Sequence, residues 1–270
     1  KELHVTASAV SHQIRALEKF LGVALFRRDG RQVVLTREGE SYLRAIREGL
    51  HLMAAATARI RAPRAGGVLT ISVAPSFGTP WLVPRLAGFQ LEHPELEVRL
   101  TSSLDLVDFA KSDVDAAVRY GAGRWRGLRS HRLFTEELIP VASPKLRIGT
   151  KRLSKPADLR RTTRLHVIPR LGQWRMWLSA AGVTDIDADA GPKFHTTPLA
   201  LEAAIAGHGV AIADRGLVTD QVRSGRLVTP FDIVLPTEYA YYLVYPQGRA
   251  DDPNIVTFRE WLLAEAQRPG

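Results

Sequence analysis

Polar and basic side chains recur at helical spacing near the start of the chain, at Ser11, His12, Arg15 and Lys19. Small hydroxyl groups can approach base edges in a major groove, and arginine and lysine can contact phosphates. Thr6 and Ser8 are residue types that accept hydrogen bonds from the first amides of a helix, so we expect the helix to begin there. The pattern is typical of a helix that contacts duplex DNA.

The opposite face of this helix is apolar. Val10, Ile14, Leu17 and Leu21 are spaced four, three and four residues apart, which predicts one buried stripe. The stripe would hold the polar face in a fixed direction.

Arginines also gather in the hairpin predicted after the helix. Asp29-Gly30 supplies a tight turn between Leu25-Phe26 and the strand of residues 33–35, which places Arg27, Arg28 and Arg31 near its tip. A solvated charged loop is the alternative, but the neighbouring helix favours a DNA-contacting wing.

The charge distribution agrees with this interpretation. The 270 residues carry a net charge of +9. Residues 1–61 hold eleven Lys or Arg against six Asp or Glu, a net +5, and the other 209 residues hold 26 against 22, a net +4. Positive charge is therefore concentrated where phosphate contacts are expected.

A long helix is predicted at residues 38–60. Apolar side chains follow a heptad spacing along it at Leu43, Ile46, Leu50, Met53 and Ile60, with Thr57 in the same series. A surface helix packed on its own domain is the alternative. The position between two modules favours a dimer, and residues 62–67 would form a hinge.

The first 61 residues resemble the winged helix-turn-helix and linker of the LysR-type transcriptional regulators. The motifs are S-A-V-S-H-Q-I-R-A-L-E from Ser8, L-G-V-A-L-F-x-R from Leu21 and V-x-L-T-x-x-G from Val33 to Gly39. Lys1-Glu2-Leu3-His4 resembles the end of the module's second helix, so we expect the first helix to be lacking. The resemblance implies base contacts from Ala7, Ser8, Ser11 and His12, a phosphate contact from Arg15, and backbone or minor-groove contacts from Arg27, Arg28 and Arg31.

Beyond residue 67, strand-like and helix-like segments alternate, which predicts parallel sheets with crossover helices. Strands are expected at residues 68–73, 98–101, 115–120, 137–142, 165–168, 210–213 and 240–245, and helices at 81–93, 105–111, 174–181, 197–206 and 255–266. Ser143-Pro144 marks the crossing to a second lobe.

This region resembles the two-lobed, periplasmic-binding-protein-like effector domain of the same family, in its glycine-cleavage-activator-like branch. The narrower likeness rests on Leu106-Val107-Asp108-Phe109, on residues 115–121 (D-A-A-V-R-Y-G) and on G-x-W-x-G-L from Gly123. The expected fold class is α/β. The expected division is a winged helix-turn-helix at 1–37, a linker helix at 38–61, a hinge at 62–67 and an effector domain at 68–270, with lobe I at 68–143 and 241–270 and lobe II at 144–240.

The effector is expected between the lobes, where loops follow strand ends and helix N-termini point inward. Three loops offer hydroxyls and backbone amides that suit a small, anionic molecule. Their candidate contacts are Ser76, Phe77, Thr79, Ser102, Ser103, Thr196 and Thr197, with Arg119 adding charge and Trp125 an aromatic ring near the mouth. Each loop could instead serve only as a helix cap. Arg119 could belong to a surface ion pair, and Trp125 could be an ordinary core aromatic.

The sequence lacks the motifs of common enzymes. It has no P-loop, no G-x-S-x-G turn, no H-E-x-x-H helix and no cysteine, and the eight histidines do not pair at ligand spacings. We therefore expect neither an enzyme nor a metal or other cofactor. No run of about 18 apolar residues is present to cross a membrane.

The sequence predicts a cytoplasmic, sequence-specific DNA-binding regulator controlled by a small-molecule effector. The expected partners are duplex DNA with an inverted repeat, a second copy in a homodimer or homotetramer, and RNA polymerase. The alternative is a small-molecule binding module with a vestigial DNA-binding head.

Overall fold

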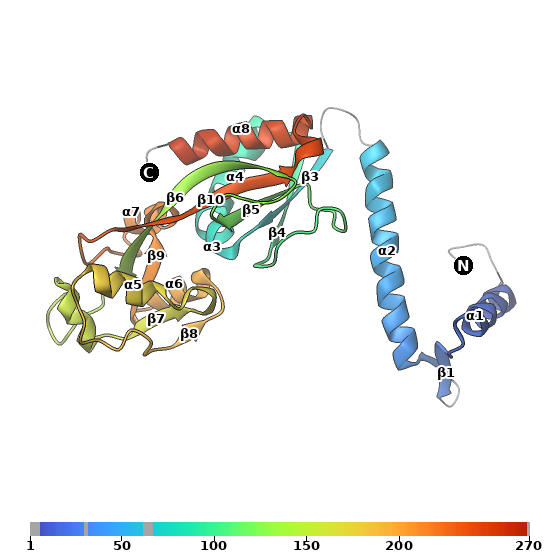
Figure 1. Ribbon diagram of the computed structural model, residues 1–270, viewed down its shortest axis with the longest axis horizontal. Coiled ribbons are helices and arrows are strands. Elements are labelled where there is room, and N and C mark those ends of the chain that lie inside the picture. Colours follow the sequence, from blue (N-terminus) through green and yellow to red (C-terminus); the bar gives the residue numbers. More distant parts are fainter. Residues whose placement is uncertain (1–5, 30–31, 62–66, 269–270) are drawn as a thin grey trace. The chain divides into compact units, whose positions relative to one another are not determined.

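The computed structural model describes residues 6–29, 32–61 and 67–268. They belong to two compact units, Lys1–Ala62 and Pro63–Gly270 (Figure 1). The first unit contains helix α1 (Ala7–Leu21), strands β1 (Phe26–Asp29) and β2 (Gln32–Leu35), and helix α2 (Arg37–Arg61). The segments 1–5 and 62–66 and the hairpin residues Gly30 and Arg31 lie outside the described residues.

Helix α1 begins at a predicted cap residue and ends at a glycine. The Thr6 hydroxyl accepts a hydrogen bond from the Ala9 amide at 3.3 Å, and Gly22 ends the helix in the left-handed conformation with φ +72°. Strands β1 and β2 pair antiparallel, with Phe26 opposite Leu35. The predicted helix and hairpin are confirmed.

The second unit is built on one eight-stranded sheet. In spatial order its strands are β4 (Leu96–Ser102), β3 (Gly67–Val73), β5 (Ala116–Gly121), β10 (Leu235–Pro246), β6 (Leu128–Ala142), β9 (Val210–Asp214), β7 (Arg164–Val167) and β8 (Lys193–Phe194). The first three strands are parallel to one another, as are the last three, but β10 and β6 run antiparallel to their neighbours. These two long strands join the lobes, so the sheet is mixed rather than parallel.

Short and long helices complete the two lobes. They are α3 (Pro75–Phe77), the π-helical turn η1 (Gly78–Leu82), α4 (Val83–Glu92), the 3₁₀ turns η2 (Pro156–Arg161), η3 (Ile168–Arg170), η4 (Arg215–Leu217) and η5 (Gln247–Arg249), and α5 (Gln173–Ala180), α6 (Thr197–Ile205), α7 (Thr219–Arg223) and α8 (Pro253–Gln267).

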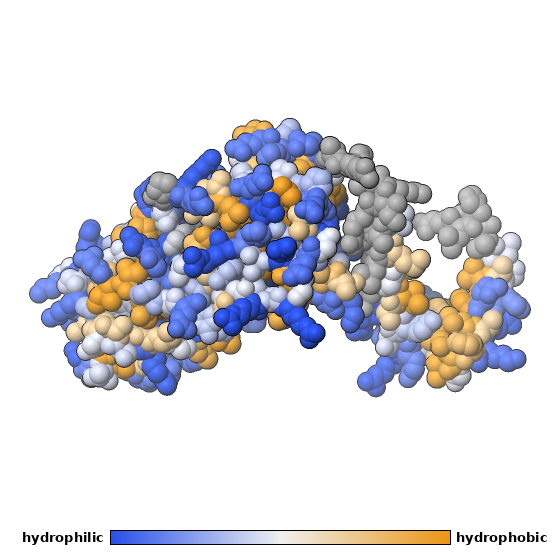
Figure 2. Space-filling view, turned by 45° about the horizontal axis from the view of Figure 1, so that its top comes forward, coloured by the Kyte–Doolittle hydropathy of each residue, from blue (hydrophilic) through white to orange (hydrophobic). Residues whose placement is uncertain are grey.

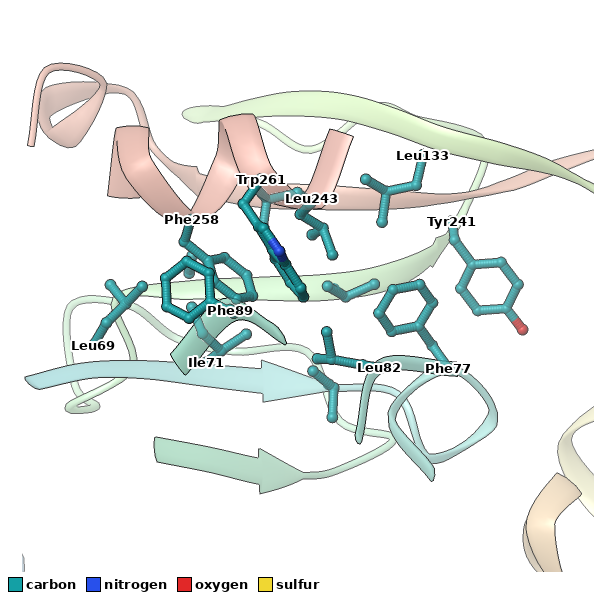
Figure 3. Packing of buried hydrophobic residues seen from close by; sticks show 14 of the residues in the cluster. Leu69, Ile71, Phe77, Leu82, Phe89, Leu133, Tyr241, Leu243, Phe258 and Trp261 are labelled. Atoms are coloured by element: carbon teal, nitrogen blue, oxygen red, sulfur yellow. The ribbon is translucent and has the colours of Figure 1, made fainter. Parts of the chain in front are cut away.

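The core of lobe I lies on one face of its sheet. Alternate strand residues, among them Ile71, Val118 and Leu243, pack there against Phe89 of α4 and Phe258 of α8. Figure 3 shows Ile71, Leu243, Phe89 and Phe258 in this core. In lobe II, α6 covers one face of the sheet and α5 covers the other. Each lobe therefore has its own core, and both are held by β6 and β10.

Besides the parallel sheet, further expectations about this unit were wrong. Residues 105–111 form a loop and turns, not a helix. The Asp108 carboxylate accepts a hydrogen bond from the Ala110 amide at 3.0 Å, and the Ser103 hydroxyl accepts one from the Asp105 amide at 3.0 Å. Such local bonds compete with helix formation. Strand β6 also begins at Leu128, nine residues before the predicted start. Its first half was not predicted because arginines interrupt the apolar pattern there.

Candidate functional sites

One candidate site is the polar face of α1. Ser8, Ser11, His12 and Arg15 are all exposed along it, and the Arg15 Nε donates to the Ser11 carbonyl at 3.3 Å. Ala7 lies in the first turn of the helix. Four of the predicted contact residues, Ser8, Ser11, His12 and Arg15, therefore occupy one accessible side of α1.

The wing is attached to α1 through Glu18. Its Oε1 atom accepts hydrogen bonds from the amides of Leu25 at 2.7 Å and Phe26 at 3.0 Å. These bonds place the start of β1 beside the helix. Arg27 and Arg28 follow directly and are exposed; as neighbours in a strand they point to opposite sides of the ribbon. Arg31, the third predicted arginine, lies outside the described residues.

The wing is also fixed to α2. The Thr36 hydroxyl donates to the Ala24 carbonyl at 2.7 Å and accepts from the Gly39 amide at 3.0 Å. A Cβ atom at Gly39 would lie 2.1 Å from the Leu25 carbonyl oxygen. In the V-x-L-T-x-x-G motif, the threonine thus bonds the wing to α2, and the glycine allows the two to pack closely.

The N-terminal unit also exposes apolar side chains. Figure 2 shows apolar surface among hydrophilic surface on this unit. Phe20 is 86% exposed and Val10, predicted to be buried, is 42% exposed. On α2, Ile46 is 43%, Leu50 60% and Met53 68% exposed, whereas Leu43 is half-buried. Ile60 lies in the last turn of α2. The predicted heptad series therefore includes three exposed apolar side chains.

The second candidate site is a cavity of about 210 Å³ between the lobes. Lobe I contributes the segment after β3, the segment after β4 and the end of β5, while lobe II contributes the end of β7, η3 and the start of α6. The lining residues are Ala74, Pro75, Ser76, Ser103, Leu104, Leu106, Arg119, Tyr120, Val167, Pro169, Arg170, His195, Thr196 and Thr197. This is where carboxyl ends of parallel strands from both lobes meet.

Eight contacts are predicted, seven in the loops together with Arg119, and five of them line this cavity: Ser76, Ser103, Arg119, Thr196 and Thr197. Trp125, predicted near its mouth, is not part of the lining. The other three of the eight do not line it either. Phe77 is completely buried in the core of lobe I, where its ring lies beside Phe134 and Tyr241. Thr79 and Ser102 are exposed and lie outside the lining. Strand alternation explains Ser102 and Ser103, because adjacent residues at a strand end point to opposite sides.

Beside the cavity, Glu136 joins residues of both lobes in a buried polar network. Its side chain is 1% exposed. The carboxylate accepts hydrogen bonds from Arg170 at 2.5 Å, Tyr120 at 2.7 Å, Thr237 at 2.8 Å and Gln173 at 3.4 Å. One cation and three neutral donors therefore satisfy the hydrogen-bonding capacity of this buried carboxylate.

Arg170 and Tyr241 extend this network to the cavity wall. The Arg170 guanidinium lies 3.7 Å from the centroid of the Tyr120 ring and donates to the Tyr241 hydroxyl at 3.0 Å. That hydroxyl also bonds Ser76 at 3.0 Å, and in Figure 3 it points away from the Phe77 ring. Lobe II therefore contacts lobe I through an arginine stacked on a tyrosine.

Burial sets the protonation of these groups. It lowers the pKa of Arg170, but Tyr241, Glu136 and Tyr120 together outweigh this effect and raise it above the usual value. Burial raises the pKa of Tyr241 to about 12 and that of Tyr120 still further. At neutral pH the tyrosines are neutral donors and Arg170 is a cation.

Sequence reasoning missed Tyr120, Glu136, Arg170 and Tyr241. Glu136 lies one residue before the predicted strand at 137–142, next to a second acid, Glu137, and nothing in the local sequence distinguishes the two. The partners of Glu136 could not be found from local sequence either, because they lie 16, 34 and 101 positions away for Tyr120, Arg170 and Thr237.

Asp214, at the end of β9, should make stability depend on pH. Burial, reinforced by Glu136, raises its pKa from 3.8 to about 7. Because the folded value lies above the unfolded one, the stabilisation is complete below the unfolded pKa and is lost as pH rises through about 7. The parent should lose up to about 4 kcal/mol of its free energy of unfolding as pH rises through this range. Asp214→Asn, which keeps an acceptor for the Gly216 amide, should remove most of this pH dependence.

Thermal melts at pH 5 and pH 8 would measure this effect as a difference in Tm between the variant and the parent. The exposed Asp251→Asn serves as the control. An Asp214→Asn protein whose Tm falls with pH as steeply as that of the parent would contradict the assignment.

Two further features of the described residues bear on function. No group of three or more His, Asp or Glu side chains in the described part of the chain is arranged to hold a metal ion. None of the described helices is both long and apolar enough to cross a membrane.

Comparison with known proteins shows the family to which this two-unit chain belongs. Residues 1–40 match the bacterial regulatory helix-turn-helix protein of the lysR family, and residues 62–267 match the LysR substrate binding domain. The chain belongs to the LysR family. It is a transcriptional regulator with a DNA-binding helix-turn-helix and an effector-binding domain.

Individual members of the family show how similar the sequences are. The chain is 43% identical over 266 residues to the glycine cleavage system transcriptional activator of Escherichia coli K12, covering 98% of this chain and 87% of the relative. It is 36% identical over 266 residues to the transcriptional activator AmpR of Pseudomonas aeruginosa, covering 98% and 88%. Both relatives are named as activators of transcription.

Solved structures show the same fold. The effector domain of Pseudomonas aeruginosa AmpR matches with a TM-score of 0.63 and 34% identity, over 74% of this chain and 96% of that one. CrgA, a LysR-type regulator from Neisseria meningitidis, matches with a TM-score of 0.60 and 26% identity, over 99% and 92%. The second match extends over both units of the chain.

Proposed function

We propose that the cavity between the lobes binds a small anionic effector and that this binding controls a DNA-binding dimer. The observation that carries the proposal is the set of polar groups at the cavity. Thr196, which precedes α6, makes no side-chain capping bond, and the Thr197 hydroxyl has no hydrogen-bond partner among the described residues. Both hydroxyls are therefore available to a ligand, which argues against a role as helix caps only.

The charges around the cavity favour an anion. Glu136 neutralises Arg170, but the other lining cation, Arg119, forms no ion pair with a carboxylate in the described part of the chain. The N-terminus of α6 adds the positive end of a helix dipole. Ser76 and Ser103 complete the proposed contacts, although their hydroxyls already bond Tyr241 and Asp105.

The effector would act by biasing the closure of the two lobes. Arg170 of lobe II stacks on Tyr120 of lobe I and shares Glu136 with it. A ligand that contacts Ser76 on one side and Thr197 on the other gains more from a closed arrangement than from an open one. Such a difference in affinity shifts the equilibrium between arrangements.

The exposed apolar series on α2 supports assembly into a homodimer or homotetramer. Ile46, Leu50 and Met53 would pack against the same residues of a second copy. Leu43 and Ile60 complete the proposed contact; Leu43 is half-buried, and the side chain of Ile60 lies outside the described part of the chain. Two α1 helices related by a twofold axis would then bind an inverted repeat in duplex DNA. RNA polymerase is the further partner we propose for a regulator of this kind, and the cytoplasm, where bacterial DNA lies, is the proposed location.

Selection of bound sequences from a random pool of DNA duplexes tests this proposal. We expect the full chain to enrich one inverted repeat. For that duplex, Arg28→Ala should weaken binding and reduce the slope of log affinity against log salt by about one, while Ser11→Ala should relax base preference and leave the slope unchanged. Fluorescence anisotropy at several salt concentrations measures both effects.

Arg44→Ala is the matched control, since Arg44 is exposed on α2 and is not among the proposed contacts. Equal losses in Arg28→Ala and Arg44→Ala would argue for unspecific attraction. Failure to enrich any sequence would favour the alternative function, a small-molecule binding module with a vestigial DNA-binding head.

A further inference from the structure

A second and larger cavity, of about 670 Å³, lies on the other face of the lobe I sheet. Residues of β3, β5 and β10 alternate between the two faces. Ile71, Val118 and Leu243 enter the core beneath α4 and α8, so Ala117, Arg119 and Val244 face the opposite way. No helix forms at residues 105–111, and loops therefore cover this second face incompletely.

The cavity has an apolar wall and a basic one. Its lining residues are Leu106, Val107, Asp108, Phe109, Ala110, Ala117, Arg119, Trp125, Arg126, Leu128, Val244 and Pro246. Trp125 is held edge-on against Tyr242, with ring centroids 5.5 Å apart. The volume lies within the range of sites for small molecules, which are mostly apolar with a few fixed polar groups.

Arg119 is the buried polar group of this cavity, with only 5% of its surface exposed. Its guanidinium donates to the Ser72 carbonyl at 3.1 Å, the Val118 carbonyl at 3.0 Å and the Ser72 hydroxyl at 2.7 Å, and its Nε atom has no partner. All these acceptors are neutral. A buried cation without a bonded counter-ion is costly, and a bound anion offsets that cost.

Arg126 adds a second cation at the same cavity. It is exposed and has no hydrogen bond or ion pair within the described ranges. The one carboxylate of the lining, Asp108, already lies 3.5 Å from Lys111. The carboxylate of Asp105 interacts electrostatically with Arg119 but does not line the cavity. The unpaired charge of the lining itself is therefore positive.

We propose that this cavity binds a small amphipathic anion, an aromatic or branched aliphatic carboxylate, at a site separate from the cleft between the lobes. The carboxylate contacts Arg126 and Arg119, and the apolar body lies against Phe109, Trp125 and Leu128. This site does not depend on the effector cleft, although Leu106 and Arg119 line both cavities.

Binding of 1-naphthoate to the full chain, measured by titration calorimetry, tests the proposal. Arg126→Gln should weaken binding about tenfold, because a hydrogen bond to a charged group is lost. Arg124→Gln is the matched control: Arg124 is equally exposed and unpaired two residues away, but it does not line the cavity. This control should bind within twofold of the parent. Absence of binding at millimolar 1-naphthoate, or equal effects of the two substitutions, would overturn the proposal.

Because Leu106 and Arg119 line both cavities, the position of the bound ligand decides between the two sites. In crystals of the full chain soaked with 4-bromobenzoate, the anomalous signal of bromine should lie beside Trp125 and Phe109. Bromine found only between Ser76 and Thr197, or at no ordered position, would refute a separate site.

Discussion

Replacing Gly39 with alanine is expected to lower DNA affinity at least a hundredfold and to loosen the winged unit. The added Cβ would lie 2.1 Å from the Leu25 carbonyl oxygen and 3.1 Å from the Leu35 side chain. Neither α2 nor β1 can move away without breaking the bonds of Thr36 and Glu18 that hold the wing. Overpacking of this kind costs about 1–3 kcal/mol or more.

Gly49→Ala in the same helix is the matched control. Nothing lies within 4 Å of a Cβ at Gly49, and alanine favours a helix over glycine by about 1 kcal/mol. We expect this variant to keep its DNA affinity and to exchange amide hydrogens in α2 more slowly. Anisotropy titrations and hydrogen exchange across residues 24–61 provide the measurements. If both glycines tolerated alanine equally, the wing would not be held as described.

Glu136→Gln is expected to destabilise the effector-binding domain by about 3–5 kcal/mol, because it leaves the Arg170 charge buried without its carboxylate. The substituted amide also presents hydrogen atoms to a site where Arg170, Tyr120 and Thr237 are all donors. One acceptor atom cannot serve them all, so the contact between the lobes should weaken together with the fold.

The neighbouring Glu137→Gln is the control, because Glu137 is half exposed and lies 3.5 Å from Arg215. A partly exposed pair contributes about 0–1 kcal/mol. Urea unfolding followed by tryptophan fluorescence would measure both variants. Combining Glu136→Gln with Arg170→Gln should recover part of the loss, since the uncompensated charge is removed. A loss from Glu136→Gln no greater than that from Glu137→Gln would show that the buried network contributes little.

Local sequence determined the N-terminal unit to a large extent. The spacing of Ile14, Leu17 and Leu21, the cap at Thr6 and the glycine at 22 specify α1 through interactions within a few residues. The resemblance to LysR regulators rests on the same short motifs and led to the family correctly. The hydroxyl-rich loops at Ser76 and Thr196 were also identifiable, because they follow strands and precede helices.

Tertiary structure decided which of the predicted residues meet. Ser76 and Phe77 are neighbours in α3, yet Phe77 packs in the core of lobe I and Ser76 lines the cleft. The region of residues 105–111 has helical spacing, but bonds from Ser103 and Asp108 hold it as a loop and leave a cavity beneath it.

The polar network of Glu136 depended still more on the fold. Strands β5, β6 and β10 and the turn η3 bring its members together from distant parts of the chain. Periodicity reports which face of an element is apolar, and caps report where an element begins. Neither contains information about which buried acid will meet which arginine, because that choice is made by the pairing of strands across the whole domain.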